Sequence, residues 1–445
     1  MVPPLVTPRN IAVVGLGKLG APIAACYADA GHHVTGADLD PRVVASVDRG
    51  LPPVSEPGLG ELMGRAKAKL RATSDLGEAI ASAEVTVIIV PTPSDQDGGF
   101  SLRHVLHVCE EVGSVLRRKA SYHLVLVTST VLPGAVEGTI KPFLEARSGK
   151  KCGVDFGLCY CPEFVALGSV IRDLQNPDFL LVGESDAVAG KIASEVLQSI
   201  CVNRPNVVRM NIANAEIAKL AVNTYVTTKI TFANMLARLC EAVPGADVDV
   251  VTGALGLDRR IGRHYLKGAI GFGGPCFPRD NVALGLVGRR LGVDVSLAET
   301  VHRANQEQTR SLLATVRRVQ KSGGTTGILG LAYKPNTNVT DESPGIGLAR
   351  ALLAEGMDVL AYDPAVHGAV ASGPGDGIRI AGSARECCRG SDVVVVVTPW
   401  DEFKGLSSVD FSPERSPVVI DCWRILDSSR LGDRVEYLPL GVGRD

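Results

Sequence analysis

Short apolar runs alternate with segments of helical periodicity over the first third of the chain. The apolar runs have strand length and lie at Ile11–Val14, His33–Ala37, Val85–Val90, Leu124–Val127 and Phe156–Cys161. A helical pattern follows the first run and continues to about Ala30, where Gly31 closes it. Alternation of this kind is typical of a parallel sheet covered by helices.

A glycine motif connects the first apolar run to its helix. The segment reads Gly15-Leu16-Gly17-Lys18-Leu19-Gly20, and Asp38 ends the next run. A tight turn needs the first glycine, close approach of a pyrophosphate needs the second, and helix–strand packing needs the third. An acid at the place of Asp38 favours NAD over NADP, because it accepts hydrogen bonds from the adenosine ribose. The first third is therefore predicted to be a Rossmann-like, NAD-binding domain.

The alternation returns after a break at Gly323–Gly324, with a helix around Ile346–Ala354. Its apolar runs are Thr326–Leu331, Asp358–Tyr362, Val393–Val397 and Val418–Asp421. Its glycines lack the dinucleotide spacing, so this second α/β region is expected to bind something other than NAD.

The middle of the chain is helical in pattern. From Asn211 to about Val243 there is no Gly or Pro, which is long for a helix of a globular protein. We expect an α/β protein with two Rossmann-like doubly wound parallel-sheet domains, joined by this long central helix and a helical middle domain. The expected domains are residues 1–205, 206–305 and 306–445.

Composition excludes some functions. A formal net charge of −2 and 21% charged residues give no electrostatic reason to expect nucleic acid or a membrane surface as a partner. The N-terminus lacks an apolar signal-peptide core, and eleven cysteines without a repeating spacing predict reduced thiols in a cytoplasmic protein. No cysteine or histidine pair has the partners that a metal site needs, so none is expected.

One cysteine stands in an unusual setting, the segment Gly268–Asp280 (GAIGFGGPCFPRD). Glycines precede Cys276, prolines flank it, and Arg279 and Asp280 follow closely. We expect a rigid, non-helical loop that presents a reactive thiolate. The alternative at this point is a Gly/Pro turn with an incidental buried cysteine.

Polar residues recur on one face of the central helix. Glu216, Lys219 and Asn223 stand at i, i+3 and i+7 among apolar neighbours. Glu216 and Lys219 form either a surface ion pair or part of a half-buried site.

Further polar residues follow the apolar runs, at the sheet edge where ligands bind in such folds. Pro91 and Thr92 follow one run, Thr130 another, and Glu163 a third; the threonines could equally cap helices, and Glu163 could be a solvated acid. Lys334 lies after the first run of the second α/β region. Arg260 is read either as a phosphate ligand or as an ion-pair partner.

Taken in order, these motifs resemble the UDP-glucose/GDP-mannose dehydrogenase family over nearly the whole chain. The matching segments are GLGKLG, VPTP, STV, PEF, NAEIAKLAVN, DRRIG, GFGGPCFPRD, YKPNT with ESP, and YDP. The resemblance implies a four-electron oxidation of a nucleotide sugar, from the C6 alcohol to the carboxylate, with two NAD⁺. Cys276 is then the nucleophile that carries a thiohemiacetal and a thioester, and Lys219 and Asn223 hold the developing oxyanion.

The resemblance implies further roles. Asp280 would activate water, Glu163 would assist acid–base steps or hydrolysis, and Thr130 would position water or the nicotinamide. Lys334 and Arg260 would contact the nucleotide diphosphate or sugar, with Arg260 reaching from a neighbouring subunit of a homodimer or larger oligomer. The remaining residues expected at the cofactor or substrate are Gly15, Gly17, Lys18, Leu19, Gly20, Asp38, Pro91, Thr92, Phe164, Phe272 and Gly273.

Some positions depart from the family pattern: Cys161, Leu167, Pro275, Arg279, Asp341 and Trp423. They leave the catalytic groups in place and concern the identity of the sugar and nucleotide. UDP-glucose is the expected substrate, and a UDP-N-acetylhexosamine, a dTDP-hexose or a GDP-hexose is the alternative. A two-electron hydroxyacid dehydrogenase of the 6-phosphogluconate type and a non-catalytic NAD sensor are the other classes; neither needs the cysteine segment.

Overall fold

The computed structural model describes residues 7–366 and 377–444. It divides into two units, Met1–Ala221 and Val222–Asp445, which we describe separately.

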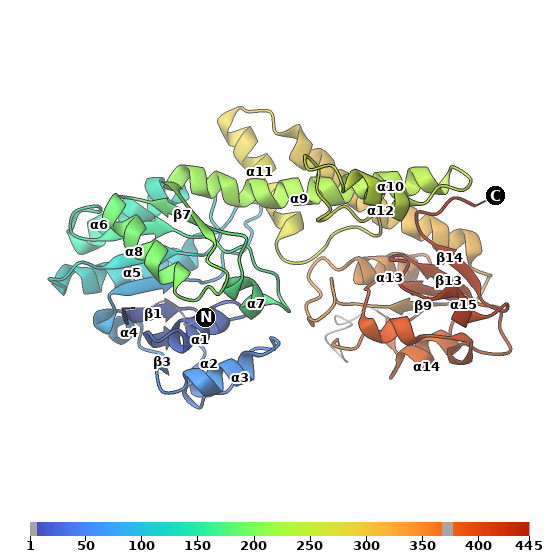
Figure 1. Ribbon diagram of the computed structural model, residues 1–445, viewed down its shortest axis with the longest axis horizontal. Helices are drawn as coiled ribbons and strands as arrows, with labels where there is room; N and C mark the ends of the chain where they lie inside the picture. The colour runs from blue at the N-terminus through green and yellow to red at the C-terminus, as the bar shows by residue number, and fades with distance from the viewer. Residues whose placement is uncertain (1–6, 367–376, 445) are drawn as a thin grey trace. The chain divides into compact units, whose positions relative to one another are not determined.

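The first unit is built on an eight-stranded sheet of order β3-β2-β1-β4-β5-β6-β7-β8 (Figure 1). The strands are β1 (Asn10–Val14), β2 (His33–Ala37), β3 (Leu70–Thr73), β4 (Val85–Ile88), β5 (Leu124–Val127), β6 (Gly157–Tyr160), β7 (Phe179–Glu184) and β8 (Asn206–Asn211). All neighbours are parallel except β6 and β7, which pair antiparallel. Apolar runs predicted β1, β2, β4, β5 and β6, whereas β3, β7, β8 and the antiparallel pair were not predicted.

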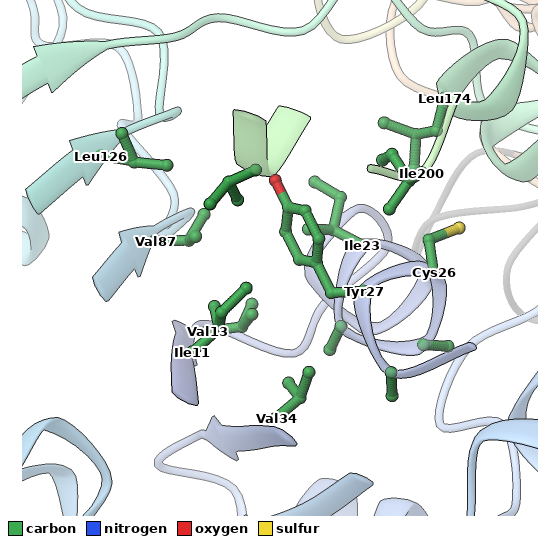
Figure 2. Close-up of a cluster of buried hydrophobic side chains, with 14 of the residues drawn as sticks. Ile11, Val13, Ile23, Cys26, Tyr27, Val34, Val87, Leu126, Leu174 and Ile200 are labelled. Carbon is green, nitrogen blue, oxygen red and sulfur yellow. The ribbon is translucent and has the colours of Figure 1, made fainter. Parts of the chain in front are cut away.

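Helices cover this sheet and complete two apolar cores. They are α1 (Gly20–Asp29), α2 (Pro41–Asp48), α3 (Leu59–Ala66), α4 (Leu76–Ser82), α5 (Arg103–Arg118), the π-helical turn η1 (Val136–Ile140), α6 (Lys141–Ser148), α7 (Val170–Gln175) and α8 (Ala187–Gln198). Alternate residues of β1 enter opposite cores: Ile11 and Val13 join one, and Ala12 and Val14 join the other. Figure 2 shows the first core, where the buried ring of Tyr27 extends from α1 toward the strand side chains.

The second unit contains a six-stranded parallel sheet of order β11-β10-β9-β12-β13-β14. Its strands are β9 (Thr325–Leu329), β10 (Asp358–Tyr362), β11 (Arg379–Ile380), β12 (Val393–Val396), β13 (Val418–Asp421) and β14 (Glu436–Pro439). Numbered from the start of its unit, each sheet contains the order 3-2-1-4-5-6 of a doubly wound fold. The predicted α/β class, with two such sheets, is confirmed.

Several helices belong wholly to this unit. They are α10 (Val248–Leu255), α11 (Phe277–Leu291), α12 (Ser296–Val319), α13 (Pro344–Ala354), α14 (Ala384–Arg389), the 3₁₀ turns η3 (Asp401–Gly405) and η4 (Ser408–Asp410), and α15 (Ser428–Leu431). The long central helix is α9 (Ile212–Glu241), 30 residues without a break (Figure 1). The division between the units falls inside it.

The turn after the first strand of each unit has the same construction. Gly15 has φ +95° and Gly330 has φ +109°. Their amides donate 2.8 Å hydrogen bonds to the carbonyls of Ala37 and Tyr362, which end the neighbouring strands. A Cβ on Gly20 would lie 1.8 Å from the Gly15 carbonyl oxygen, and a Cβ on Gly345 would lie 2.2 Å from that of Gly330. The second unit therefore retains the first and third glycines of the motif.

What differs is the length of chain between the two glycines. Five positions separate Gly15 from Gly20, and fifteen separate Gly330 from Gly345. The second unit thus contains a longer segment where the first has its Gly17 turn. This insertion explains why the spacing alone did not indicate the shared turn.

Within residues 7–366 and 377–444, no helix has both the length and the apolar character needed to cross a membrane.

Replacing Gly20 with alanine tests the close packing of the first turn. The new Cβ would collide with a backbone oxygen 1.8 Å away, so Gly20→Ala should destabilise the first unit by at least about 2 kcal/mol. The matched control is Gly64→Ala in α3, where a Cβ meets nothing within 4 Å, and which should stabilise by about 0.5–1 kcal/mol. Urea unfolding measures both, and equal stabilities for the two variants would contradict the packing argument.

Candidate active site

Cys276 caps the N-terminus of α11 rather than lying inside a loop. Its φ and ψ are −109° and −56°, and Pro278 stands in the first turn of the helix. Residues 277–280 are helical, so the expectation of a non-helical loop is correct before Cys276 and wrong after it. Proline is well tolerated in a first helical turn, which explains why the sequence pattern was ambiguous.

All eleven cysteines lie in the described residues, and Cys276 differs from the others in exposure. Nine are buried, Cys201 is half-buried, and Cys276 alone is exposed. The alternative of an incidental buried thiol is therefore wrong. The glycines before it lie tightly against the chain: a Cβ on Gly273 would be 2.3 Å from the Glu342 carbonyl oxygen, and one on Gly274 would be 2.6 Å from the Tyr333 ring.

Asp280 lies one turn into α11 and is buried. Its amide donates a 2.8 Å bond to the Cys276 carbonyl, and its carboxylate accepts a 2.6 Å bond from the side-chain amide of Asn223. The guanidinium of Arg279 lies 3.8 Å from the other carboxylate oxygen. Cys276, Asp280 and Asn223 thus form one cluster in the second unit, which we call the cysteine cluster.

Glu163, Phe164 and Lys219 form a second cluster, in the first unit, which we call the lysine cluster. The buried ammonium of Lys219 donates a 2.7 Å hydrogen bond to the Glu163 carbonyl and lies 4.8 Å from the centre of the Phe164 ring. Burial raises the pKa of the Glu163 carboxyl to about 7, against the opposing effect of the Lys219 charge. A carboxyl with such a pKa exchanges protons near neutral pH.

Glu216 does not form the surface ion pair with Lys219 that was one of the two alternatives, since both residues are buried. It is completely buried, and its carboxylate accepts bonds of 2.6 Å and 2.8 Å from the amides of Gly134 and Val136. It therefore fixes the segment that follows Thr130, at the start of η1. The i, i+3 spacing to Lys219 gave no indication of this role, because the backbone amides that bind Glu216 lie far from it in the sequence.

The first glycine turn has the shape that a dinucleotide pyrophosphate requires. Gly15 and Gly20 lie against backbone and side-chain atoms, but a Cβ on Gly17 would meet nothing within 4 Å. Gly17 and Lys18 are exposed, Leu19 is half-buried, and α1 begins directly after them. Open space beside a helix N-terminus is suited to phosphate groups, so these residues fit the expected cofactor.

The other predicted cofactor residues lie at the ends of strands in the same unit. Asp38 follows β2, and its two carboxylate oxygens accept 2.7 Å and 2.9 Å bonds from the amides of Leu16 and Asp40. The buried Thr92 hydroxyl donates a 2.8 Å bond to the Thr130 carbonyl, which links the segments after β4 and β5. Pro91 beside it is exposed.

Two further predicted substrate residues lie in the second unit. Arg260 is exposed and its guanidinium lies 2.6 Å from the Asp258 carboxylate, which favours the ion-pair alternative in this chain taken alone. Lys334 is half-buried, and its ammonium lies 6.0 Å from the centre of the Tyr333 ring.

Arg424 is a residue whose role the sequence did not reveal. Its guanidinium donates two bonds to Asp249, of 2.8 Å and 2.9 Å, and one of 2.7 Å to the Gly268 carbonyl at the start of the cysteine segment. A further 2.7 Å bond reaches the Leu440 carbonyl. Arg424 therefore has a structural role, because it joins α10, the cysteine segment and the residue that follows β14.

Three models of one family match the chain in succession. The NAD-binding domain of the UDP-glucose/GDP-mannose dehydrogenase family matches residues 9–201. Its central domain matches residues 213–307, and its UDP-binding domain matches residues 327–428. The chain is also 36% identical over 421 residues to a UDP-glucose 6-dehydrogenase of Haloferax volcanii, covering 94% of this chain and 97% of that one. The chain belongs to the UDP-glucose/GDP-mannose dehydrogenase family.

Other members of the family are also similar to this chain over most of its length. A GDP-mannose 6-dehydrogenase of Pseudomonas syringae pv. syringae is 36% identical over 369 residues, covering 81% of this chain and 83% of that one. The solved UDP-glucose dehydrogenase of Pyrobaculum islandicum superposes with a TM-score of 0.88 at 33% identity, covering 98% of this chain and 99% of that one. Membership makes the protein an NAD-dependent oxidoreductase of nucleotide sugars, as expected from the sequence.

The raised pKa of Glu163 makes a prediction about stability against pH. The folded chain holds this proton up to about pH 7, whereas the ordinary value is 4.5. The contribution of Glu163 to the free energy of unfolding is therefore complete below pH 4.5. About 3 kcal/mol of it is lost as the pH rises to 7. Glu163→Gln removes that dependence, so its stability relative to the unaltered chain should rise by this amount between pH 4.5 and 7. Urea unfolding at several pH values measures it, and a difference that stays constant with pH would contradict the assignment.

Proposed function

We propose that this enzyme oxidises the C6 alcohol of UDP-glucose to the carboxylate in two steps, with Cys276 as a covalent nucleophile. The observation that supports this most is the cysteine cluster: an exposed thiol at a helix N-terminus, with a buried carboxylate one turn away that is bonded to Asn223. A helix N-terminus favours negative charge on a group at its cap.

The first oxidation converts the alcohol to an aldehyde. Bound NAD⁺ supplies the acceptor for one hydride in each of the two oxidations. The buried Lys219 ammonium stabilises negative charge on the substrate oxygen when the hydroxyl proton leaves, and Glu163, with its pKa near neutrality, takes up that proton. We assign Thr130 to positioning water or the nicotinamide.

The second oxidation requires a nucleophile. The aldehyde carbon has no hydroxyl group, so it can lose a hydride only after a nucleophile has added to it. The Cys276 sulfur adds to the aldehyde carbon, an S–C bond forms, and the carbonyl oxygen takes up the proton to give a thiohemiacetal. Loss of hydride from that carbon and of the hydroxyl proton gives a thioester. Asn223 and Lys219 donate hydrogen bonds to the oxygen on which negative charge develops.

Hydrolysis completes the reaction. Water adds to the thioester carbon, the C–S bond breaks, and the carboxylate leaves while the thiol is restored. Asp280 is the proposed acceptor of the water proton, because it is buried and lies one turn from Cys276. Glu163 assists this step.

Recognition of cofactor and nucleotide is divided between the two units in this proposal. Cofactor binding is assigned to Gly15, Gly17, Lys18, Leu19, Gly20, Asp38, Pro91, Thr92 and Thr130. Substrate binding is assigned to Glu163, Phe164, Lys219, Asn223, Arg260, Phe272, Gly273 and Lys334. The repeated glycine turn at Gly330 supports nucleotide binding by the second sheet, as the UDP-binding domain match does.

We propose UDP-glucose because the UDP-glucose 6-dehydrogenase of Haloferax volcanii aligns with nearly the whole chain. The GDP-mannose 6-dehydrogenase of Pseudomonas syringae aligns with less of it. A UDP-N-acetylhexosamine and a dTDP- or GDP-hexose are the rivals. The expected cytoplasmic location and the three-domain boundaries stay predictions.

The stoichiometry of the reaction tests the function. With UDP-glucose the enzyme should form two NADH per sugar, and kcat/KM should be lower for UDP-N-acetylglucosamine, dTDP-glucose and GDP-mannose. Cys276→Ala should lower uronic acid formation at least about a thousandfold, while Cys201→Ser, at a half-buried cysteine outside both clusters, should leave it unchanged. One NADH per sugar, or normal uronic acid release by Cys276→Ala, would contradict the mechanism.

We also propose that the protein is a homodimer that uses the second-unit part of α9. Tyr225, Phe232, Met235 and Leu239 are exposed by 63%, 45%, 46% and 59%. Their spacings of 7, 3 and 4 place them along one face of the helix. An apolar row of this size in water is typical of a surface that a second copy of the chain covers.

Light scattering tests the dimer. The unaltered protein should have twice the 46.7 kDa mass of the chain, and Met235→Glu should yield the single-chain mass, because it places a charge between the other apolar residues of the proposed interface. Val188→Glu, at an exposed apolar residue of α8, is the control and should stay dimeric. A monomeric unaltered protein would exclude this surface as a stable interface.

A further inference from the structure

Three side-chain amides bind the backbone of the cysteine segment over Ala269–Phe272. Asn305 of α12 accepts a 2.7 Å bond from the Phe272 amide and donates one of 2.8 Å to the Phe272 carbonyl. Asn234 of α9 accepts from the Ala269 amide and donates to the Ile270 carbonyl, both at 2.8 Å. Gln308 of α12 donates a 2.7 Å bond to the Ala269 carbonyl. We call these residues the amide clamp.

The clamp replaces secondary structure for this stretch. Residues 268–276 lie in no helix or strand, and all of them are described. A buried backbone polar group without a hydrogen-bond partner costs about 1–3 kcal/mol. The hydrogen bonds of the clamp therefore stabilise this conformation of the backbone. Asn305 is notable because it binds both the N–H and the C=O of Phe272, which fixes the two peptide groups on either side of that residue.

The segment also contacts the longer chain that separates Gly330 from Gly345, which we call the insertion. The Gly274 amide donates a 2.9 Å bond to the Asp341 carbonyl, and Gly273 lies against the Glu342 carbonyl, 2.3 Å from where a Cβ would be. The segment is therefore bound from α12 at Phe272 and from the insertion at Gly274. Only Pro275 stands between Gly274 and Cys276.

We infer that Asn305 is a positioning residue for Cys276 and serves the second oxidation selectively. The inference rests on the proposed function, because only the second oxidation needs the thiol. The covalent chemistry is unchanged: the S–C bond to the aldehyde carbon must form while the aldehyde lies within reach. A displacement of the nucleophile by about 1 Å costs about a hundredfold in rate, whereas transfer of the first hydride does not involve the sulfur.

Transient kinetics of Asn305→Ala test this role with UDP-glucose as the probe. At saturating UDP-glucose and NAD⁺, where weaker substrate binding through Phe272 or Gly273 does not limit the rate, the first NADH should form within about twofold of the unaltered rate. Formation of the second should be about a hundredfold slower. The yield in a limited time should fall from two NADH per sugar toward one, with aldehyde trapped by a hydrazine reagent. A merely structural loss would reduce both phases together.

Gly271→Ala disturbs the same contact without removing the amide. A Cβ on Gly271 would lie 2.8 Å from the Asn305 side-chain oxygen, so this variant should slow the second phase too. Gln306→Ala, at the exposed next residue of α12, is the matched control and should leave both phases unchanged.

The outcomes separate the two levels of the proposal. If the unaltered enzyme forms one NADH per sugar, the proposed four-electron function fails. If it forms two, and both Asn305→Ala and Gly271→Ala keep the unaltered second phase, the positioning role is overturned. Thermal unfolding identifies a variant that does not fold, in which case the remaining variant decides; if neither folds, the clamp acts on stability as a whole and the selective role is rejected.

Discussion

The backbone that leads to Cys276 must have its polar groups satisfied without a helix or strand to do so. The chain solves this with side-chain amides from α9 and α12 and with the carbonyl of Asp341, which accepts a bond from the Gly274 amide. Glycines allow the approach, since a Cβ on Gly271 or Gly273 would collide with the surrounding chain. The exposed thiol can therefore be rigidly held although the residues before it form no regular structure.

The two sheets share one turn and use it differently. In the first unit the chain between the glycines is short and leaves Gly17 open, as a pyrophosphate requires. In the second unit the corresponding chain is ten residues longer, from the spacings of Gly15–Gly20 and Gly330–Gly345, and its end contacts the cysteine segment. Lengthening a surface loop costs little free energy, so the same fold can bind a nucleotide and also support a nucleophile.

Sequence reasoning succeeded where the signal is local. The strand at Asp358–Tyr362 and the 30-residue helix α9 follow from apolar runs and from the absence of Gly and Pro, and the motif at Gly15 gave the cofactor fold. It failed where the partner is distant in sequence. The ligands of Glu216 are backbone amides about 80 positions away, and Arg424 reaches Gly268 across 156. Amides such as Asn305 carry no motif at all, because their partners are peptide groups that any residue supplies.

Direct observation of the acyl-enzyme is the most direct test of the central claim that Cys276 forms a thioester. The enzyme is mixed with UDP-glucose and excess NAD⁺, quenched in acid within the first turnover, and digested for mass spectrometry. The account predicts that the peptide containing Cys276 gains the mass of the acyl group, and that hydroxylamine removes it. An unmodified Cys276 peptide at times when uronic acid is already forming would contradict the account.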